Sequence, residues 1–153
     1  MKRFKFSLEK VLRLRSQETE QAKRALGRAM EAEEAARQSV ESIASALAER
    51  ITQMQARERA GLSAAEFGVM RHFLLFLQRE LDQARGVLEA AQQVTQQRRL
   101  ELLEARRRER ALEKLKEHRL EGYLLESLRE EQKELDEYAN RLGLNGRAPD
   151  LDT

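Results

Sequence analysis

Hydrophobic residues recur every three to four positions along residues 7–60, with charged and polar residues between them. Small and aliphatic side chains alternate as positions a and d of a heptad, which is typical of helices that pack in a coiled coil. Five polar residues interrupt the seam: Thr19 and Glu33 fall on a, and Arg15, Arg50 and Arg57 fall on d. The apolar seam residues are Leu12, Leu26, Val40, Leu47 and Met54 on a, and Leu8, Ala22, Ala29, Ala36 and Ile43 on d.

Residues 64–142 carry a second heptad and predict a second, longer helix. After Leu112 the leucines move to a displaced stripe that contains Leu115, Leu128, Leu135 and Leu142, so we expect the contact register to shift there. The first register has Phe67, Leu74, Leu81, Leu88, Leu102 and Tyr123 on a, and Met70, Leu77, Ala84, Ala91, Ala105 and Leu112 on d.

The segment Gly61–Phe67 holds the signals that end one helix and begin the next. Gly61 can adopt the left-handed conformation that closes a helix. Ser63 and Glu66 have the spacing of a capping box, in which each side chain binds the other residue's backbone N–H. The sequence therefore predicts helices over about 7–60 and 64–142, joined by a turn at 61–63.

Two helices joined by so short a turn predict an all-α fold: an antiparallel coiled-coil hairpin whose second helix is longer and overhangs the first. In such a hairpin, contacting residues have numbers that add to about 124, so that Leu8 faces the region of residue 116. We expect one rod over residues 1–142 and a disordered tail over 143–153, which contains Asn145-Gly146 and Pro149. The leucine stripe beyond about residue 120 then lacks a partner within the chain.

Composition supports helices and gives no sign of a membrane span. Of the 153 residues, 37% are charged and 5% aromatic, with one proline and no cysteine, which fits long helices and excludes disulfides. The longest apolar run, Phe73–Leu77, is far shorter than a transmembrane helix. The basic N-terminus lacks the apolar run of a signal peptide, so we expect a cytoplasmic protein without direct membrane insertion.

Catalytic chemistry finds no support in the sequence. The two histidines, His72 and His118, are far apart and have no third ligand at metal spacing. There is no glycine-rich phosphate loop and no nucleophile motif. We therefore expect a non-enzyme without a cofactor, metal or catalytic residue.

Charge is unevenly distributed although the net charge is only +2. Residues 1–15 contain six Lys/Arg and one Glu, residues 98–119 contain nine Lys/Arg and five Glu, and residues 120–142 contain three Lys/Arg and seven Asp/Glu. The Arg106–Arg110 cluster has three interpretations: a solvated face with internal ion pairs, a surface for an acidic protein, or a nucleic-acid contact. Interleaved glutamates and the absence of stacking aromatics argue against nucleic acid.

Phe73–Leu77 predicts a hydrophobic patch near the turn. Only Leu74 and Leu77 fall on the seam, whereas Phe73, Leu75 and Phe76 fall on g, b and c, which a pair of helices cannot bury. Such a patch suits a docking partner, and the alternative is self-association or coverage by a third helix.

Several segments resemble the flagellar export protein family FliJ. The most specific are the N-terminal block Phe4-Lys5-Phe6-Ser7-Leu8-Glu9-Lys10-Val11-Leu12-Arg13-Leu14-Arg15 and Glu131-Gln132-Lys133-Glu134-Leu135-Asp136-Glu137-Tyr138-Ala139. Similarity continues over residues 103–115, and together with the turn and the Phe73–Leu77 run it covers all but the tail.

This resemblance implies a stalk-like coiled coil, similar to the rotor stalk of rotary ATPases, whose terminal end inserts into the hexameric flagellar export ATPase and stimulates it. It also implies contacts with the export gate membrane protein FlhA and with export chaperones, at the cytoplasmic face of the membrane at the flagellar base. For the gate, the implied residues are Phe73 and Leu77, with Phe76 and Ile43 nearby; positions that are aromatic in other members are Ala46 and Arg50 here. Candidate contacts to the ATPase ring are Arg13, Arg15, Arg119, Tyr123, Arg129, Gln132, Lys133, Asp136 and Tyr138.

Two alternatives to a flagellar stalk stay open. The stalk protein of a virulence type III secretion system would share the architecture. A coiled-coil scaffold could instead self-associate through the overhang beyond residue 120.

Overall fold

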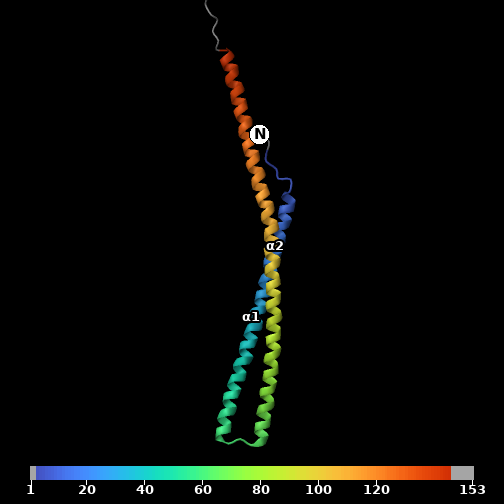
Figure 1. Ribbon diagram of the computed structural model, residues 1–153, viewed down its shortest axis with the longest axis vertical. Coiled ribbons are helices and arrows are strands. Elements are labelled where there is room, and N and C mark those ends of the chain that lie inside the picture. Colours follow the sequence, from blue (N-terminus) through green and yellow to red (C-terminus); the bar gives the residue numbers. More distant parts are fainter. Residues whose placement is uncertain (1–2, 146–153) are drawn as a thin grey trace, which may run out of the picture. The chain divides into compact units, whose positions relative to one another are not determined.

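The computed structural model describes residues 3–145 and contains two helices, α1 (Glu9–Ala60) and α2 (Ala64–Asn145). The helices pack against each other, and residues 3–145 contain no strand, which confirms the predicted all-α fold with two long helices (Figure 1). Contacts divide the chain into two units. We call residues 16–106 the turn unit, and residues 3–15 together with 107–145 the terminal unit.

The turn between the helices has the predicted capping chemistry. Gly61 has a φ of 97°, in the left-handed region where a side chain would be strained. The backbone N–H of Glu66 donates to Ser63 Oγ at 3.2 Å, and the N–H of Ser63 donates to Glu66 Oε2 at 3.3 Å. This reciprocal pair satisfies two donors at the start of α2 that would otherwise lack helical partners.

In the turn unit, burial follows the predicted heptads. Each seam position from Thr19 to Leu47 in α1, and from Met70 to Ala105 in α2, is buried or half-buried. Small residues form much of this seam, with Ala29, Ala36 and Ala84 among the most buried. Small side chains allow the two helix backbones to approach closely, although each turn then buries less apolar area.

A polar group lies inside this seam. The Thr95 side chain is only 1% exposed, and its hydroxyl donates to the backbone carbonyl of Ala29 at 3.3 Å. Because a buried hydroxyl needs a hydrogen-bond partner, this contact fixes which residues of the two helices face each other. Thr95 was not among the predicted apolar seam residues, although it lies seven positions after Leu88 and seven before Leu102.

In the terminal unit the contacts differ from the prediction. The expected register shift after Leu112 accounts for only part of the packing: Leu115 of the displaced stripe is half-buried, but Lys116, Arg119 and Tyr123 of the original register contact N-terminal residues. The leucines at 128, 135 and 142 are exposed, as predicted for a stripe that lacks a partner within the chain. Here α2 meets both the start of α1, through Glu9, and the preceding non-helical residues, through Phe4, Phe6 and Ser7, so aromatic and polar contacts supplement the heptad.

The helix ends also differ slightly from the expected positions. α1 begins at Glu9 rather than near residue 7, and the Ser7 hydroxyl accepts a hydrogen bond from Arg119. α2 continues to Asn145, so the first three residues of the expected tail 143–153 are helical, and the others lie outside the described residues. Over residues 3–145, neither helix contains a segment both long and apolar enough to cross a membrane.

Candidate functional site

The first candidate surface is a group of exposed apolar side chains on α2 in the turn unit. We call Val69, Phe73, Leu75 and Phe76 the apolar patch; their exposed fractions are 71%, 39%, 44% and 51%. They remain exposed because the seam buries only the a and d side chains of the helix pair. Phe73 and Phe76 face each other with ring centroids 6.2 Å apart, so the patch is partly ordered by its own aromatic contact.

The four residues implied for gate docking do not share one environment. Phe73 and Phe76 belong to the apolar patch, whereas Leu77 and Ile43 are half-buried on the helix seam. A partner could therefore reach the two phenylalanines directly, and could reach Leu77 and Ile43 only at their exposed edges.

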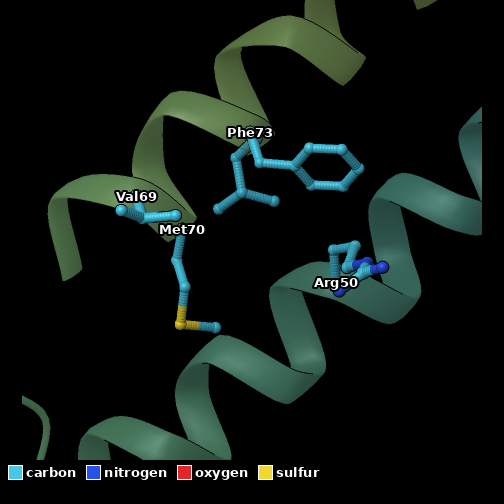
Figure 2. A pocket seen from close by; sticks show the side chains of 5 residues that line it. Arg50, Val69, Met70 and Phe73 are labelled. Atoms are coloured by element: carbon cyan, nitrogen blue, oxygen red, sulfur yellow. The ribbon is translucent and has the colours of Figure 1, made fainter. Parts of the chain in front are cut away.

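A pocket of about 190 Å³ lies beside the patch, between α1 and α2 (Figure 2). Its lining residues are Arg50, Val69, Met70, Phe73 and Leu74. In Figure 2, Met70 extends from α2 toward α1, and Arg50 reaches from α1 to the Phe73 ring. The Arg50 guanidinium carbon lies 4.9 Å from the ring centroid, within the range of a cation–π contact.

Arg50 is a polar residue on position d of the predicted seam, and it stands where other members of the family have an aromatic residue. Its contact with Phe73 could have been found from the predicted pairing, because the two residue numbers add to 123. Other contacts between α2 and the part of the chain before the turn follow the same rule. The residue numbers add to 124 for Ala29–Thr95 and to 127 for Phe4–Tyr123.

The second candidate surface is the terminal unit, where the N-terminal segment lies on α2. Phe6 is 8% exposed, and the Arg119 guanidinium lies 5.7 Å from its ring centroid. Arg119 also donates to Ser7 Oγ at 2.9 Å, and the Phe4 and Tyr123 rings are 5.5 Å apart. Aromatic, cation–π and hydrogen-bond contacts thus add to the half-buried seam leucines Leu8, Leu12 and Leu112 in this unit.

A wide, shallow depression of about 470 Å³ lies on this surface and is predominantly basic. Lys116 is neutralised by Glu9, with 2.9 Å between Nζ and Oε2. The other cationic side chains form no ion pair with any residue of 3–145, so the depression suits an anionic group of a partner. Its lining residues are Arg3, Phe4, Lys5, Phe6, Glu9, Arg13 and Lys116.

The predicted ring contacts lie in three settings within the terminal unit. Arg13 lines the basic depression, and Arg15 is half-buried. Arg119 and Tyr123 are engaged by the N-terminal segment. Residues 128–143 are all exposed, which includes the remaining five candidates: Arg129, Gln132, Lys133, Asp136 and Tyr138.

We call residues 124–143 the exposed end of α2. Only Ser127 in this segment is half-buried, and its leucines are 52% to 63% exposed. Gln132 donates to Asp136 at 3.1 Å, a contact within one helix turn. A helix with this much exposed leucine has the composition of one that packs against a partner.

Over residues 3–145, no three His, Cys, Asp or Glu side chains lie close enough to hold a metal ion. Hydrogen bonds from Lys23 and from Arg98 lower the pKa of Glu20 and Glu101, respectively, but each pair lies between neighbouring turns of one helix, outside both surfaces. The arrangement suits protein binding.

Comparison with known proteins agrees with this architecture. The family described as flagellar FliJ protein matches residues 4–148. A protein from Chlamydia trachomatis, whose structure was solved as that of a YscO homologue, has a similar fold, with a TM-score of 0.58 and 18% identity. That alignment covers 93% of this chain and 96% of the other. No curated protein sequence matches the chain.

Proposed function

Because the chain belongs to the flagellar FliJ protein family, we propose that it is a non-enzymatic stalk of the flagellar type III protein export apparatus. In this function the protein binds a hexameric export ATPase through the terminal unit and promotes its activity. A stalk of this kind supplies no chemical group. It acts because its contacts differ between the conformations of the ATPase subunits.

The exposed end of α2 carries this proposal. It is a long amphipathic helix whose leucines have no partner in residues 3–145, and the basic depression of the same unit offers unpaired cations. A ring that surrounds such a helix could cover the leucines and pair with the cations. The stalk would then also link the ATPase, through the apolar patch, to the export gate, and would bind export chaperones near the membrane.

The test is to titrate the protein into its cognate export ATPase and to follow the rate of ATP hydrolysis. Reversing three charges together, Arg13→Glu, Arg129→Glu and Lys133→Glu, should reduce the maximal stimulation severalfold. The matched control reverses three exposed arginines of the turn unit: Arg28→Glu, Arg57→Glu and Arg79→Glu. Circular dichroism should show equal helicity for both variants. Full stimulation by the terminal variant would refute the assignment.

A virulence type III secretion stalk is the second candidate, since a YscO homologue shares the fold. Expression of this chain in a flagellated strain that lacks its own stalk protein separates the two. Restored swimming favours the flagellar function. Restored secretion only in a virulence-system mutant favours the alternative.

A further inference from the structure

Arg50 is the one charged residue that lines the pocket beside the apolar patch. It occupies a seam position of the α1 heptad but is exposed, unlike the seam residues from Thr19 to Leu47. Its guanidinium lies over the Phe73 ring rather than against a carboxylate, and it forms no ion pair with any residue of 3–145. A cation therefore stands at the edge of an apolar pocket without an anion of its own.

The contact with Phe73 leaves the hydrogen-bonding groups of Arg50 available. A guanidinium stacks on an aromatic ring with its face, whereas its five N–H donors point outward in its plane. The edge can thus bind a carboxylate with two parallel hydrogen bonds while the face stays on the ring. Because Phe73 already restrains the guanidinium, less side-chain entropy is lost when a partner binds.

The rest of the pocket suits an apolar side chain. Val69, Met70, Phe73 and Leu74 form the walls, and the volume is about 190 Å³. For comparison, an engineered apolar cavity of about 150 Å³ holds a benzene molecule. The Phe76 ring, 6.2 Å from that of Phe73, extends the apolar surface beyond the pocket. A nucleic acid would need several cations here, and Arg50 is the single one in the lining.

We infer that Arg50 determines partner specificity at the apolar patch by selecting a protein segment in which an Asp or Glu neighbours an apolar side chain. The apolar side chain enters the pocket, and the carboxylate binds the edge of the Arg50 guanidinium. This inference rests on the proposed function in one respect, because it takes the segment to belong to the export gate protein that the patch docks.

The experiment measures binding of the full chain to the purified cytoplasmic part of the cognate gate protein by calorimetry at low and high salt. Arg50→Gln should weaken binding about tenfold, and Arg50→Glu should weaken it further through repulsion of the carboxylate. The wild-type affinity should fall with salt, and this dependence should be smaller for Arg50→Gln. Arg50→Lys should recover only part of the affinity, because an ammonium cannot bind a carboxylate in the same bidentate geometry.

Two control variants separate charge from shape. Arg57→Glu changes an exposed arginine one heptad away on α1 and should bind within about twofold of the wild type, since its charge lies outside the pocket. Phe73→Ala should lose binding because it removes both the pocket wall and the support of Arg50. Thermal melts identify any variant whose folding has changed.

The outcomes separate the inference from the proposed function. Loss of binding with Phe73→Ala but not with Arg50→Glu overturns the inference and leaves gate docking intact. Equal losses with Arg50→Glu and Arg57→Glu also overturn it, since general charge would then explain the effect. A wild-type protein that does not bind the gate overturns the proposed docking and the inference with it. Self-association that Arg50→Glu abolishes would assign the pocket to a second copy of this chain instead.

Discussion

The two units use the same helix, α2, in opposite ways. In the turn unit, α2 meets a second long helix, and the heptad seam buries its leucines and alanines. In the terminal unit, α2 meets the first residues of α1 and the non-helical segment before them through aromatic, cation–π and ion-pair contacts, and its leucines beyond Leu120 are exposed. A leucine in the heptad pattern therefore stabilises the helix pair in the turn unit, whereas in the exposed end of α2 it forms a surface that a partner can bind.

Leucine truncations should give the largest contrast between the units. Leu81→Ala removes a side chain that is 5% exposed and should lower the free energy of unfolding by about 2–4 kcal/mol. Leu135→Ala removes one that is 63% exposed and should change it by less than about 0.5 kcal/mol. Urea unfolding followed by circular dichroism measures both. A similar loss for both variants would mean that the end of α2 is covered in the free protein.

The next largest effect should come from the aromatic contact of the terminal unit. Phe6→Ala removes a buried ring from an otherwise small interface and should destabilise the attachment of the N-terminal segment by about 2 kcal/mol. Hydrogen exchange should then accelerate at the first turns of α1, while Leu81 and Leu102 in the turn unit keep their protection. Uniform acceleration over the whole chain would contradict two separately stabilised units.

The capping box should contribute less. Ser63→Ala removes the acceptor for the Glu66 N–H and should cost about 1 kcal/mol in the free energy of unfolding. Ser45→Ala, an exposed serine inside α1, serves as the control and should be neutral or slightly stabilising. Equal unfolding midpoints for wild type and Ser63→Ala would show that the turn forms without this cap.

The smallest effect is expected at Gly122, close to the start of the exposed end of α2. No atom lies within 4 Å of a Cβ added there, and the glycine is helical, so Gly122→Ala should stabilise this part of the helix by about 0.5–1 kcal/mol. Slower hydrogen exchange over residues 120–130 would be the readout. Unchanged exchange would indicate that the helix is already held at this point.

The sequence was sufficient to predict the features that depend on local chemistry and heptad spacing. Gly61, Ser63 and Glu66 predicted the turn, and the heptads predicted the seam of the turn unit and its pairing. The turn and the seam both depend on the spacing of residues along the chain, which can be read from one sequence. The roles assigned to the individual site residues stay predictions.

The sequence was insufficient where a contact depends on the partner segment rather than on periodicity. The leucines after Leu112 suggested a shifted register, but Lys116, Arg119 and Tyr123 of the original register contact Glu9, Phe6 and Phe4, respectively. The heptad placed Arg50 on the seam, but its side chain is exposed and contacts the ring of Phe73. Hydropathy patterns do not encode cation–π or ion-pair contacts between distant segments.

The most direct test of the central claim is to image the cognate export ATPase ring together with this protein by electron cryomicroscopy. The account predicts helical density in the central pore that fits the exposed end of α2, residues 124–143, with its leucines against the ring. An empty pore at saturating protein, or density that fits the turn unit instead, would contradict the assignment of the terminal unit as the ATPase-binding part of the chain.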